Sequence, residues 1–369
     1  MEKKRLKVIV SGGGTGGHIF PAISIANALK ELQPDVDILF VGAEGKMEME
    51  KVPAAGYKIV GLPVAGFQRK LSLKTFTFFW KLFKSMMKAR SVIREFKPNV
   101  VVGVGGYASG PILKTAQKKG IPTLIQEQNS YAGVTNRLLA KKAKAICVAY
   151  EGMEKYFPAD KIILTGNPVR QDLMNLESKK DEARKYFNLA EGQKVVLVLG
   201  GSLGAKTLNK SILGYMKEIG EQRDIILIWQ TGKLYNEEIK RELENFDASN
   251  VRLYDFISHM DLAFSIADLI VSRAGAGTIS ELCLVGKPTI LVPSPNVAED
   301  HQTMNARALV RKNAALMVED KNAPKELVVV AFELLNNAKK SDEFSKNILE
   351  LALPNAARVI AEKVLDLAR

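Results

Sequence analysis

Cysteine is scarce in this chain of 369 residues, which contains only Cys147 and Cys283. Neither belongs to a CxxC pair or a cysteine–histidine cluster, so the sequence indicates no disulfide framework and no zinc site. Long apolar runs are also missing. No uncharged stretch approaches the roughly 20 residues that cross a bilayer, and the apolar run behind the basic N-terminus is too short for a signal peptide. Any membrane contact is therefore expected to be peripheral.

Positive charge and apolar residues are abundant instead. The formal net charge is +13, and 47% of the residues are hydrophobic. Such a chain can bury the cores of two domains, and its charge predicts an anionic partner: nucleic acid, an anionic membrane or a phosphorylated small molecule. No nucleic-acid-binding motif accompanies the charge, so we expect no nucleic-acid partner.

Short β-branched runs alternate with longer helical stretches in both halves of the chain. Strands apolar on both faces predict parallel sheets covered by helices, hence an α/β fold of two Rossmann-like domains. We expect these domains at 1–165 and 166–351, with a C-terminal helix at about 352–369 packing back onto the first. The strands are expected at 6–11, 36–42, 99–104, 121–126 and 144–149, and again at 195–200, 224–230, 251–256, 268–273 and 288–293.

Glycine turns follow three of these strands, at 12–17, 103–111 and 200–205. Turns without Cβ atoms let backbone N–H groups approach phosphate, and the following helix N-terminus adds positive potential. The first turn also satisfies GxGxxG, the dinucleotide fingerprint. Its expected ribose-binding acid is poorly placed, because Glu44 follows the end of the second strand, so we disfavour a nicotinamide cofactor.

Two segments of the first half carry candidate catalytic groups. His18 opens a helix and could act as general base or cap the turn. The segment QEQNS at 126–130 follows a strand. There Glu127 could act as base or orient His18, and Asn129 could donate to a sugar or phosphate; both could instead cap the next helix.

The second half offers two polar segments. At 272–282, a small-residue loop opens a helix carrying Thr278 and Glu281, whose carboxylate suits ribose hydroxyls. At 293–306, a polar loop enters a helix. There Asp300, His301, Gln302 and Asn305 could read sugar hydroxyls or simply form a solvated helix start.

Residues 67–97 combine many basic residues with aromatic and aliphatic side chains. This composition predicts an interfacial helix that contacts an anionic membrane surface, although part of its apolar stripe must pack on the sheet. The expected membrane contacts are Phe76, Phe79, Trp80, Phe83 and Lys84.

Several motifs together resemble the MurG family, the bacterial glycosyltransferases that add N-acetylglucosamine to undecaprenyl-diphosphate-linked N-acetylmuramoyl pentapeptide. They are GGGTGGHIFPA, GVGGYASGP, QEQN, GNPVR at 166–170, GGSLGA and AGAGTISE. The resemblance covers essentially the whole chain. It implies a B-type glycosyltransferase fold, two domains facing a cleft, with acceptor and membrane on the N-terminal half and UDP-N-acetylglucosamine mainly on the C-terminal half.

The resemblance also implies a site and a reaction. An acceptor hydroxyl, deprotonated by His18 or Glu127, would displace UDP with inversion and without a required metal, although Mg²⁺ could assist. Ser202 suits the diphosphate, the Ile257 backbone the uracil, and Glu281 the ribose. The implied donor contacts are Thr15, Gly16, Gly17, Asn129, Arg170, Ser202, Ile257, Ala276, Gly277, Thr278, Glu281 and Gln302.

The chain departs from the family pattern at three positions. Gln126 stands where the family often has histidine, which rules out a base there; His301 replaces one of two paired glutamines; and Gly277 replaces a bulkier residue. The further expectations are a location on the cytoplasmic face of the bacterial inner membrane and a cell-wall enzyme complex. A UDP-N-acetylglucosamine 2-epimerase, a transferase for other lipid acceptors and a non-enzymatic membrane scaffold are the alternatives.

Overall fold

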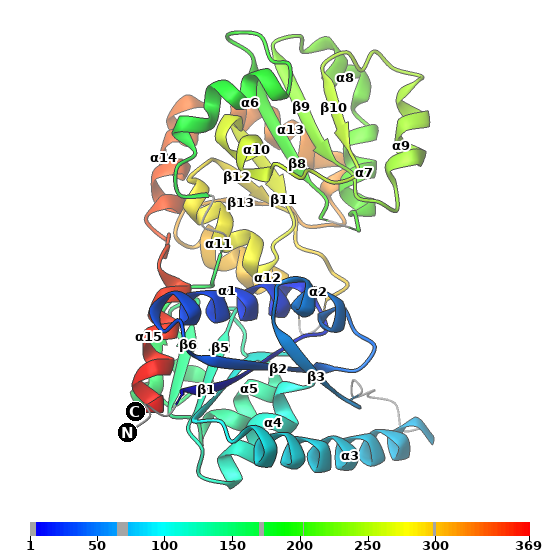
Figure 1. Ribbon diagram of the computed structural model, residues 1–369. Helices are drawn as coiled ribbons and strands as arrows, with labels where there is room; N and C mark the ends of the chain where they lie inside the picture. Colours follow the sequence, from blue (N-terminus) through cyan, green and yellow to red (C-terminus); the bar gives the residue numbers. More distant parts are fainter. Residues whose placement is uncertain (1–4, 65–72, 170–172, 202, 298–299) are drawn as a thin grey trace. The chain divides into compact units, whose positions relative to one another are not determined.

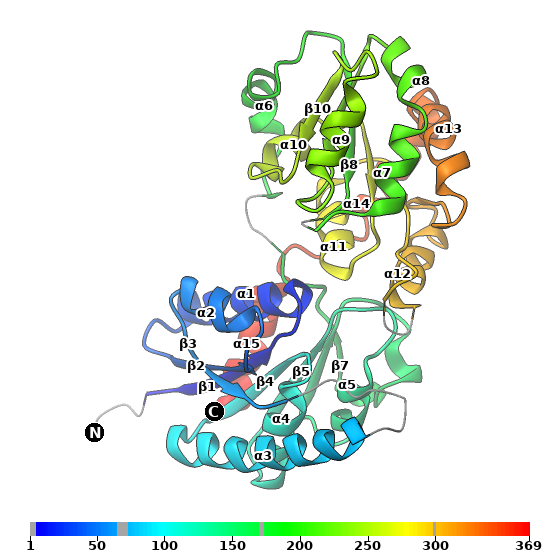
Figure 2. The ribbon, with the colours of Figure 1, turned by 90° about the vertical axis from the view of Figure 1, so that its right-hand side faces the viewer.

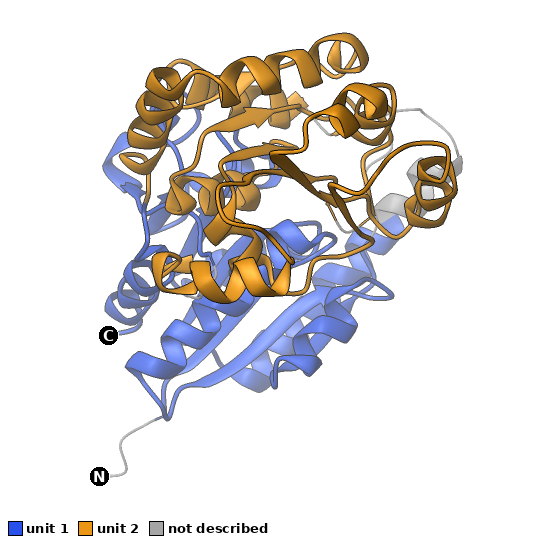
Figure 3. Cartoon of the chain, turned by 90° about the horizontal axis from the view of Figure 1, so that it is seen from above, with its two compact units in different colours: residues 1–169, 353–369 blue, residues 170–352 orange. Residues whose placement is uncertain are grey.

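The structure is a computed structural model that describes residues 5–64, 73–169, 173–201, 203–297 and 300–369, without the side chains of 73–79. The chain divides into two compact units (Figure 3). Unit 1 comprises residues 1–169 and 353–369, and unit 2 comprises residues 170–352. Each unit is built on one parallel sheet, so the expected α/β fold of two Rossmann-like domains is confirmed.

Unit 1 contains a seven-stranded sheet, several strands of which are labelled in Figure 1. Its strand order is β3-β2-β1-β4-β5-β6-β7. All of its neighbouring strands pair in parallel. The strands are β1 (Lys7–Gly12), β2 (Asp37–Ala43), β3 (Lys58–Leu62), β4 (Val100–Gly105), β5 (Thr123–Glu127), β6 (Ala145–Val148) and β7 (Ile162–Leu164). The sequence did not predict the edge strands β3 and β7, which are short and only partly buried.

Helices cover both faces of this sheet because its strands are apolar on both sides. Helices α1 and α15 lie on one face, and α3, α4 and α5 lie on the other (Figure 2). Val8 and Val10 share a buried cluster with residues of α1 and α15, whereas Ile9 shares one with residues of α3, α4 and α5. The C-terminal helix α15 therefore belongs to the core of unit 1. The helices are α1 (Gly16–Leu32), α2 (Glu48–Ala54), α3 (Leu73–Phe96), α4 (Ser109–Lys118), α5 (Val134–Ala140) and α15 (Ala356–Ala368).

Unit 2 contains a six-stranded parallel sheet in the order β10-β9-β8-β11-β12-β13. The strands are β8 (Lys194–Leu199), β9 (Ile225–Gln230), β10 (Val251–Tyr254), β11 (Leu269–Ser272), β12 (Thr289–Leu291) and β13 (Leu316–Met317). Trp229 of β9 is fully buried, in a core cluster that also contains residues of β8, α7 and α13. The helices are α6 (Lys180–Tyr186), α7 (Lys206–Leu213), α8 (Met216–Glu221), α9 (Asn236–Leu243), α10 (Met260–Ile266), α11 (Ala276–Val285), α12 (His301–Val310), α13 (Ala323–Leu335) and α14 (Ala338–Leu349).

The strand order reverses once in each sheet. In unit 1 the reversal lies between β1 and β4, and in unit 2 it lies between β8 and β11. Ligands of open α/β sheets bind beyond the carboxyl ends of the strands at such a switch point. The glycine turns that follow β1, β4 and β8 are therefore where the fold predicts a site.

Membrane-spanning segments are absent from the described part of the chain, in which no helix combines the length and apolarity needed to cross a bilayer.

Candidate active site

Two glycine turns of unit 1 lie directly against each other. Gly12 pairs with Gly105 where β1 and β4 end. Gly106 has φ of 87°, and a Cβ there would collide with the Gly13 carbonyl. A residue with a side chain is therefore excluded at Gly106 by both conformation and space. The first turn continues into α1, whose N-cap is Thr15.

His18 lies in the first turn of α1, partly exposed. Its Nδ1 is 3.2 Å from the Gly13 carbonyl oxygen and 3.3 Å from the Thr15 hydroxyl. A carbonyl oxygen only accepts hydrogen bonds, so the neutral ring is protonated at Nδ1 and carries its lone pair on Nε2. That is the tautomer a general base needs. The ring also lies over Gly105, where a Cβ would be 2.8 Å from Nε2.

The first turn rests on a carboxylate that sequence reasoning missed. Glu48 of α2 is fully buried, and its two oxygens accept from the backbone N–H groups of Gly14 and Ala43, each at 2.9 Å. A Cβ at Gly13 would collide with this carboxylate. The N–H of Gly14 is therefore engaged within the protein, and a buried negative charge lies directly behind the turn.

Glu127 lies at the end of β5 and is buried. Its Oε1 accepts from the Asn129 backbone N–H at 3.1 Å, and its Oε2 accepts from Gly133 N–H at 3.0 Å and Asn136 Nδ2 at 2.8 Å. Burial raises the pKa of this carboxyl against the lowering effect of those hydrogen bonds. Oε2 holds the start of α5 and Oε1 holds the backbone of Asn129, so both oxygens are engaged within unit 1 and the geometry favours His18 over Glu127 as the base.

The neighbouring amides also bond within unit 1. Gln126 donates to Asn167 at 2.9 Å, and Asn167 donates to the Gln128 carbonyl at 3.0 Å. Gln126 and Gln128 are hydrogen-bonded to each other as well. The polar density of QEQN therefore joins β5 to the GNPVR segment, whose Asn167 sequence reasoning did not single out.

In unit 2 the glycine turn after β8 opens α7, and the segment after β11 opens α11. Gly275 is the N-cap of α11, so Ala276, Gly277 and Thr278 lie in its first turn and not in a loop. All are partly exposed, as is Glu281 one turn later. A Cβ at Gly277 would meet only open space. The first-turn N–H groups of both helices are potential anion ligands.

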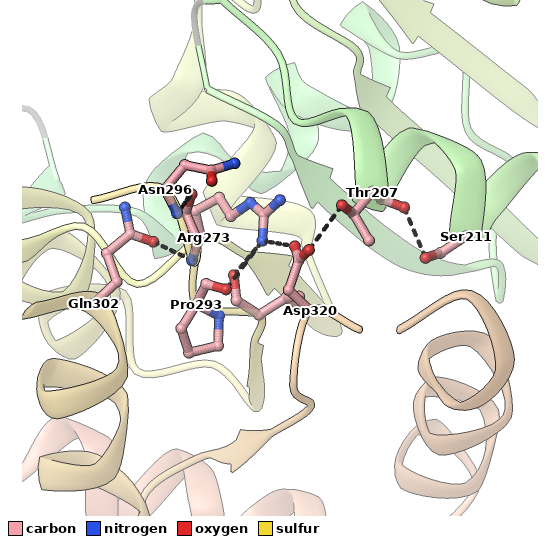
Figure 4. Close-up of polar contacts among 9 residues, drawn as sticks. Thr207, Ser211, Arg273, Pro293, Asn296, Gln302 and Asp320 are labelled. Atoms are coloured by element: carbon pink, nitrogen blue, oxygen red, sulfur yellow. Dashed lines mark hydrogen bonds and ion pairs between the residues drawn. The ribbon is translucent and has the colours of Figure 1, made fainter. Parts of the chain in front are cut away.

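Two further candidates of unit 2 already have protein partners. Gln302 of α12 accepts from the Ser294 N–H at 2.8 Å through Oε1 (Figure 4). Buried Ile257 donates its backbone N–H to Gln230 at 2.9 Å. Because the N–H of Ile257 is engaged, the carbonyl of Ile257 is the backbone group that we propose for contact with uracil. Arg170 and Ser202, and the side chains of Phe76 and Phe79, lie outside the described residues.

The described residues hold no cluster of three or more histidine, cysteine or acidic residues arranged to bind a metal ion. The groups at the turns of the two units include an imidazole, backbone N–H groups, hydroxyls and carboxylates. Imidazoles and carboxylates can act as general acids or bases, and backbone N–H groups can bind anions.

Two family models match most of the chain. The glycosyltransferase family 28 N-terminal domain matches residues 8–148, and the glycosyltransferase family 28 C-terminal domain matches residues 195–363. The chain therefore belongs to glycosyltransferase family 28.

Individual relatives and solved structures show which members of the family this chain is similar to. A Bacteroides fragilis protein is 58% identical over 365 residues, covering 99% of this chain and 96% of its own. It is named UDP-N-acetylglucosamine–N-acetylmuramyl-(pentapeptide) pyrophosphoryl-undecaprenol N-acetylglucosamine transferase. The crystal structure of Acinetobacter baumannii MurG is 29% identical with a TM-score of 0.80, covering 98% of this chain and 99% of its own. A Neisseria meningitidis UDP-GlcNAc 2-epimerase, 17% identical with a TM-score of 0.68 and covering 98% and 100%, shares the fold alone.

Proposed function

We propose that this enzyme transfers N-acetylglucosamine from UDP-N-acetylglucosamine to the 4-hydroxyl of undecaprenyl-diphospho-N-acetylmuramoyl pentapeptide, converting lipid I to lipid II in peptidoglycan synthesis. The observation that carries this proposal is the 58% identity, over nearly the full length of both chains, to the Bacteroides fragilis protein that is named as this transferase. The His18 tautomer that the Gly13 carbonyl favours can take a proton from a hydroxyl acceptor, which supports this proposal.

The proposed step is a single displacement. Nε2 of His18 takes the proton of the acceptor hydroxyl, whose oxygen bonds to the anomeric carbon on the face opposite UDP. The bond between that carbon and the phosphate oxygen breaks, and UDP leaves with the electron pair. Helix N-termini of unit 2 and Arg170 stabilise the charge that develops on the diphosphate.

The donor contacts of the proposed site are Thr15, Gly16, Gly17, Asn129, Arg170, Ser202, Ile257, Ala276, Gly277, Thr278, Glu281 and Gln302. Glu281 would accept from the ribose hydroxyls, and Gln302 would bind the sugar. The Ser294–Gln302 hydrogen bond uses the side-chain oxygen of Gln302, so its amide nitrogen is the group proposed to donate.

Release of UDP tests the proposal. Purified protein is given UDP-N-acetylglucosamine with and without lipid-linked muramoyl pentapeptide, and both UDP and epimerised donor are measured. We expect UDP only when acceptor is present and no epimer. Epimer formed without acceptor would replace the proposal with a 2-epimerase. A folded protein that yields neither product with dispersed lipid would also contradict it.

We propose that α3 brings unit 1 to the cytoplasmic face of the inner membrane. Trp80 and Phe83 are 54% and 56% exposed and stack on each other, and Lys84 lies over the Trp80 ring. Apolar rings beside lysines suit an anionic interface, whereas Ala89 and Ile93 further along α3 are buried in the core.

Vesicle binding tests this contact. A variant carrying Trp80→Ser and Phe83→Ser is compared with wild type on phosphatidylglycerol vesicles. We expect binding weakened roughly tenfold or more, because two aromatic side chains no longer leave water. Leu234→Ser, at a 68% exposed residue of unit 2, is the control and should bind as wild type. Equal binding by all three proteins would contradict the contact.

The cell-wall enzyme complex stays a prediction.

A further inference from the structure

Arg273 lies between the end of β11 and the Gly275 N-cap of α11. Its side chain is only 17% exposed. One guanidinium nitrogen, Nη1, donates to the carbonyls of Val292 and Pro293 at 3.0 and 3.2 Å, and also forms an ion pair with Asp320 (Figure 4). Arg273 therefore ties the turn after β11 to the loop that follows β12.

Asp320, which follows β13, extends the connection to a third segment. Its second oxygen, Oδ2, accepts from the Thr207 hydroxyl at 2.9 Å. Thr207 lies in the first turn of α7, immediately after the glycine turn at 200–205. Asp320 is 18% exposed, so this pair is largely withdrawn from water. Such a pair holds a defined geometry, and loss of one partner leaves the other charge poorly compensated.

The network joins the segments that follow β8, β11, β12 and β13, and all four leave the carboxyl edge of the unit 2 sheet. The loop after β12 continues to Ser294, whose N–H binds Gln302. Asn305 of α12 in turn donates to the Ala274 carbonyl at 3.4 Å. The Arg273–Asp320–Thr207 network thus sets the spacing between the turn of α7, the first turn of α11 and the loop that enters α12.

We propose that Arg273 and Asp320 are positioning residues that hold the turn of α7, the first turn of α11 and the loop after β12 at the spacing a UDP-sugar requires, without themselves contacting the donor. This inference rests on the proposed function, which assigns the donor to the same segments. A positioning role makes Asp320 as important for donor binding as Arg273. Direct binding of phosphate by Arg273 would not require Asp320.

Titration of UDP and UDP-N-acetylglucosamine into the full-length protein by calorimetry tests the network, alongside steady-state kinetics. We expect Arg273→Met and Asp320→Asn each to weaken UDP binding and raise the donor KM about tenfold or more, with the acceptor KM unchanged. Thr207→Val should have a smaller effect, about threefold. The double variant should be no weaker than the worse single one, because both changes break one network. Asp247→Asn, which opens the exposed Arg223–Asp247 pair of the same unit, is the matched control.

The possible results separate the explanations. Asp320→Asn binding UDP as wild type while Arg273→Met does not would overturn the proposal and make Arg273 a direct ligand. Normal UDP binding by folded Asp320→Asn and Thr207→Val, even if Arg273→Met fails to fold, would reduce the network to a stabilising contact and also overturn it. Wild-type protein that binds no UDP would instead contradict the proposed function.

Discussion

The turns at the two switch points use the same strand–glycine–helix device but differ in what lies behind them. In unit 1 the turn rests on the buried carboxylate of Glu48, which engages the Gly14 N–H. In unit 2 the Arg273–Asp320 pair joins the corresponding segments, and Asp320 accepts from the Thr207 hydroxyl in the first turn of α7. Turns of the same kind are thus supported by different contacts.

This difference assigns the two turns different tasks. A buried carboxylate behind a turn disfavours a diphosphate there, because like charges repel. The same carboxylate fixes the turn that carries His18, which must accept a proton from a neutral hydroxyl. We therefore expect unit 1 to supply the base and unit 2 to bind the nucleotide, with Thr15, Gly16 and Gly17 meeting the sugar of the donor.

Replacing His18 should produce the largest effect. His18→Ala removes the proposed base, and kcat should fall roughly a hundredfold to ten-thousandfold, as general-base losses do. Binding of UDP, measured by calorimetry, should be unchanged. His259→Ala, at an exposed histidine of unit 2, is the control. If His18→Ala kept the wild-type kcat, the assignment of the general base to unit 1 would be contradicted.

Replacing Glu48 should have the next largest effect. Glu48→Gln places an amide NH₂ against the N–H of Gly14 or Ala43, so one buried hydrogen bond is lost and two donors oppose each other. The free energy of unfolding in urea should fall by about 2 kcal/mol. Glu50→Gln, whose parent side chain is 80% exposed on the same helix, should change it little. Equal unfolding free energies for the two variants would refute the support assigned to Glu48.

Glu127 should make stability depend on pH. Burial raises the pKa of its carboxyl in the folded state above the unfolded value of about 4.3. The folded protein then binds this proton more tightly, so the associated stability is fully present below the unfolded pKa and is lost as pH rises through the folded pKa.

Urea unfolding across pH measures this contribution. The unfolding free energy of wild type minus that of Glu127→Gln should be largest in acid and decline as pH rises. Glu154→Gln, at an exposed residue, supplies the baseline. A difference that instead grew with pH would show that the hydrogen bonds outweigh burial.

Gly277 should give the smallest effect. A Cβ there meets open space within α11, so Gly277→Ala should raise the free energy of unfolding by about 0.5 kcal/mol, through reduced freedom of the unfolded chain. Gly286→Ala at the other end of α11, where φ is 66°, should instead be destabilising. Destabilisation by Gly277→Ala would show that the first turn needs glycine for its own geometry.

Local patterns in the sequence were sufficient to predict most of the fold. The β-branched runs and glycine turns predicted the central strands of both sheets, because strand and turn preferences are local. They did not reveal β13, whose two residues at Leu316–Met317 are too few for a pattern. His18 and the residues at the start of α11 were found because each follows a strand and opens a helix.

The contacts that support these residues were not predictable from local patterns. Glu48 acts on Gly14 from 34 residues away, and Asp320 meets Arg273 across 47 residues. No local pattern distinguishes such acids from solvated ones. Conversely, the acid and amides of QEQN looked like ligands, whereas Glu127 and Gln126 are buried and bonded within the protein. The roles of the site residues stay predictions.

Hydrogen exchange with and without UDP tests the division of tasks between the two turns most directly. Backbone N–H groups that bind the diphosphate should become protected, whereas those on a turn without the nucleotide should not. We expect UDP to protect residues 200–207 and 275–282 and to leave 12–18 unchanged. Protection confined to 12–18 would contradict the account, because the nucleotide would then bind the turn that rests on Glu48.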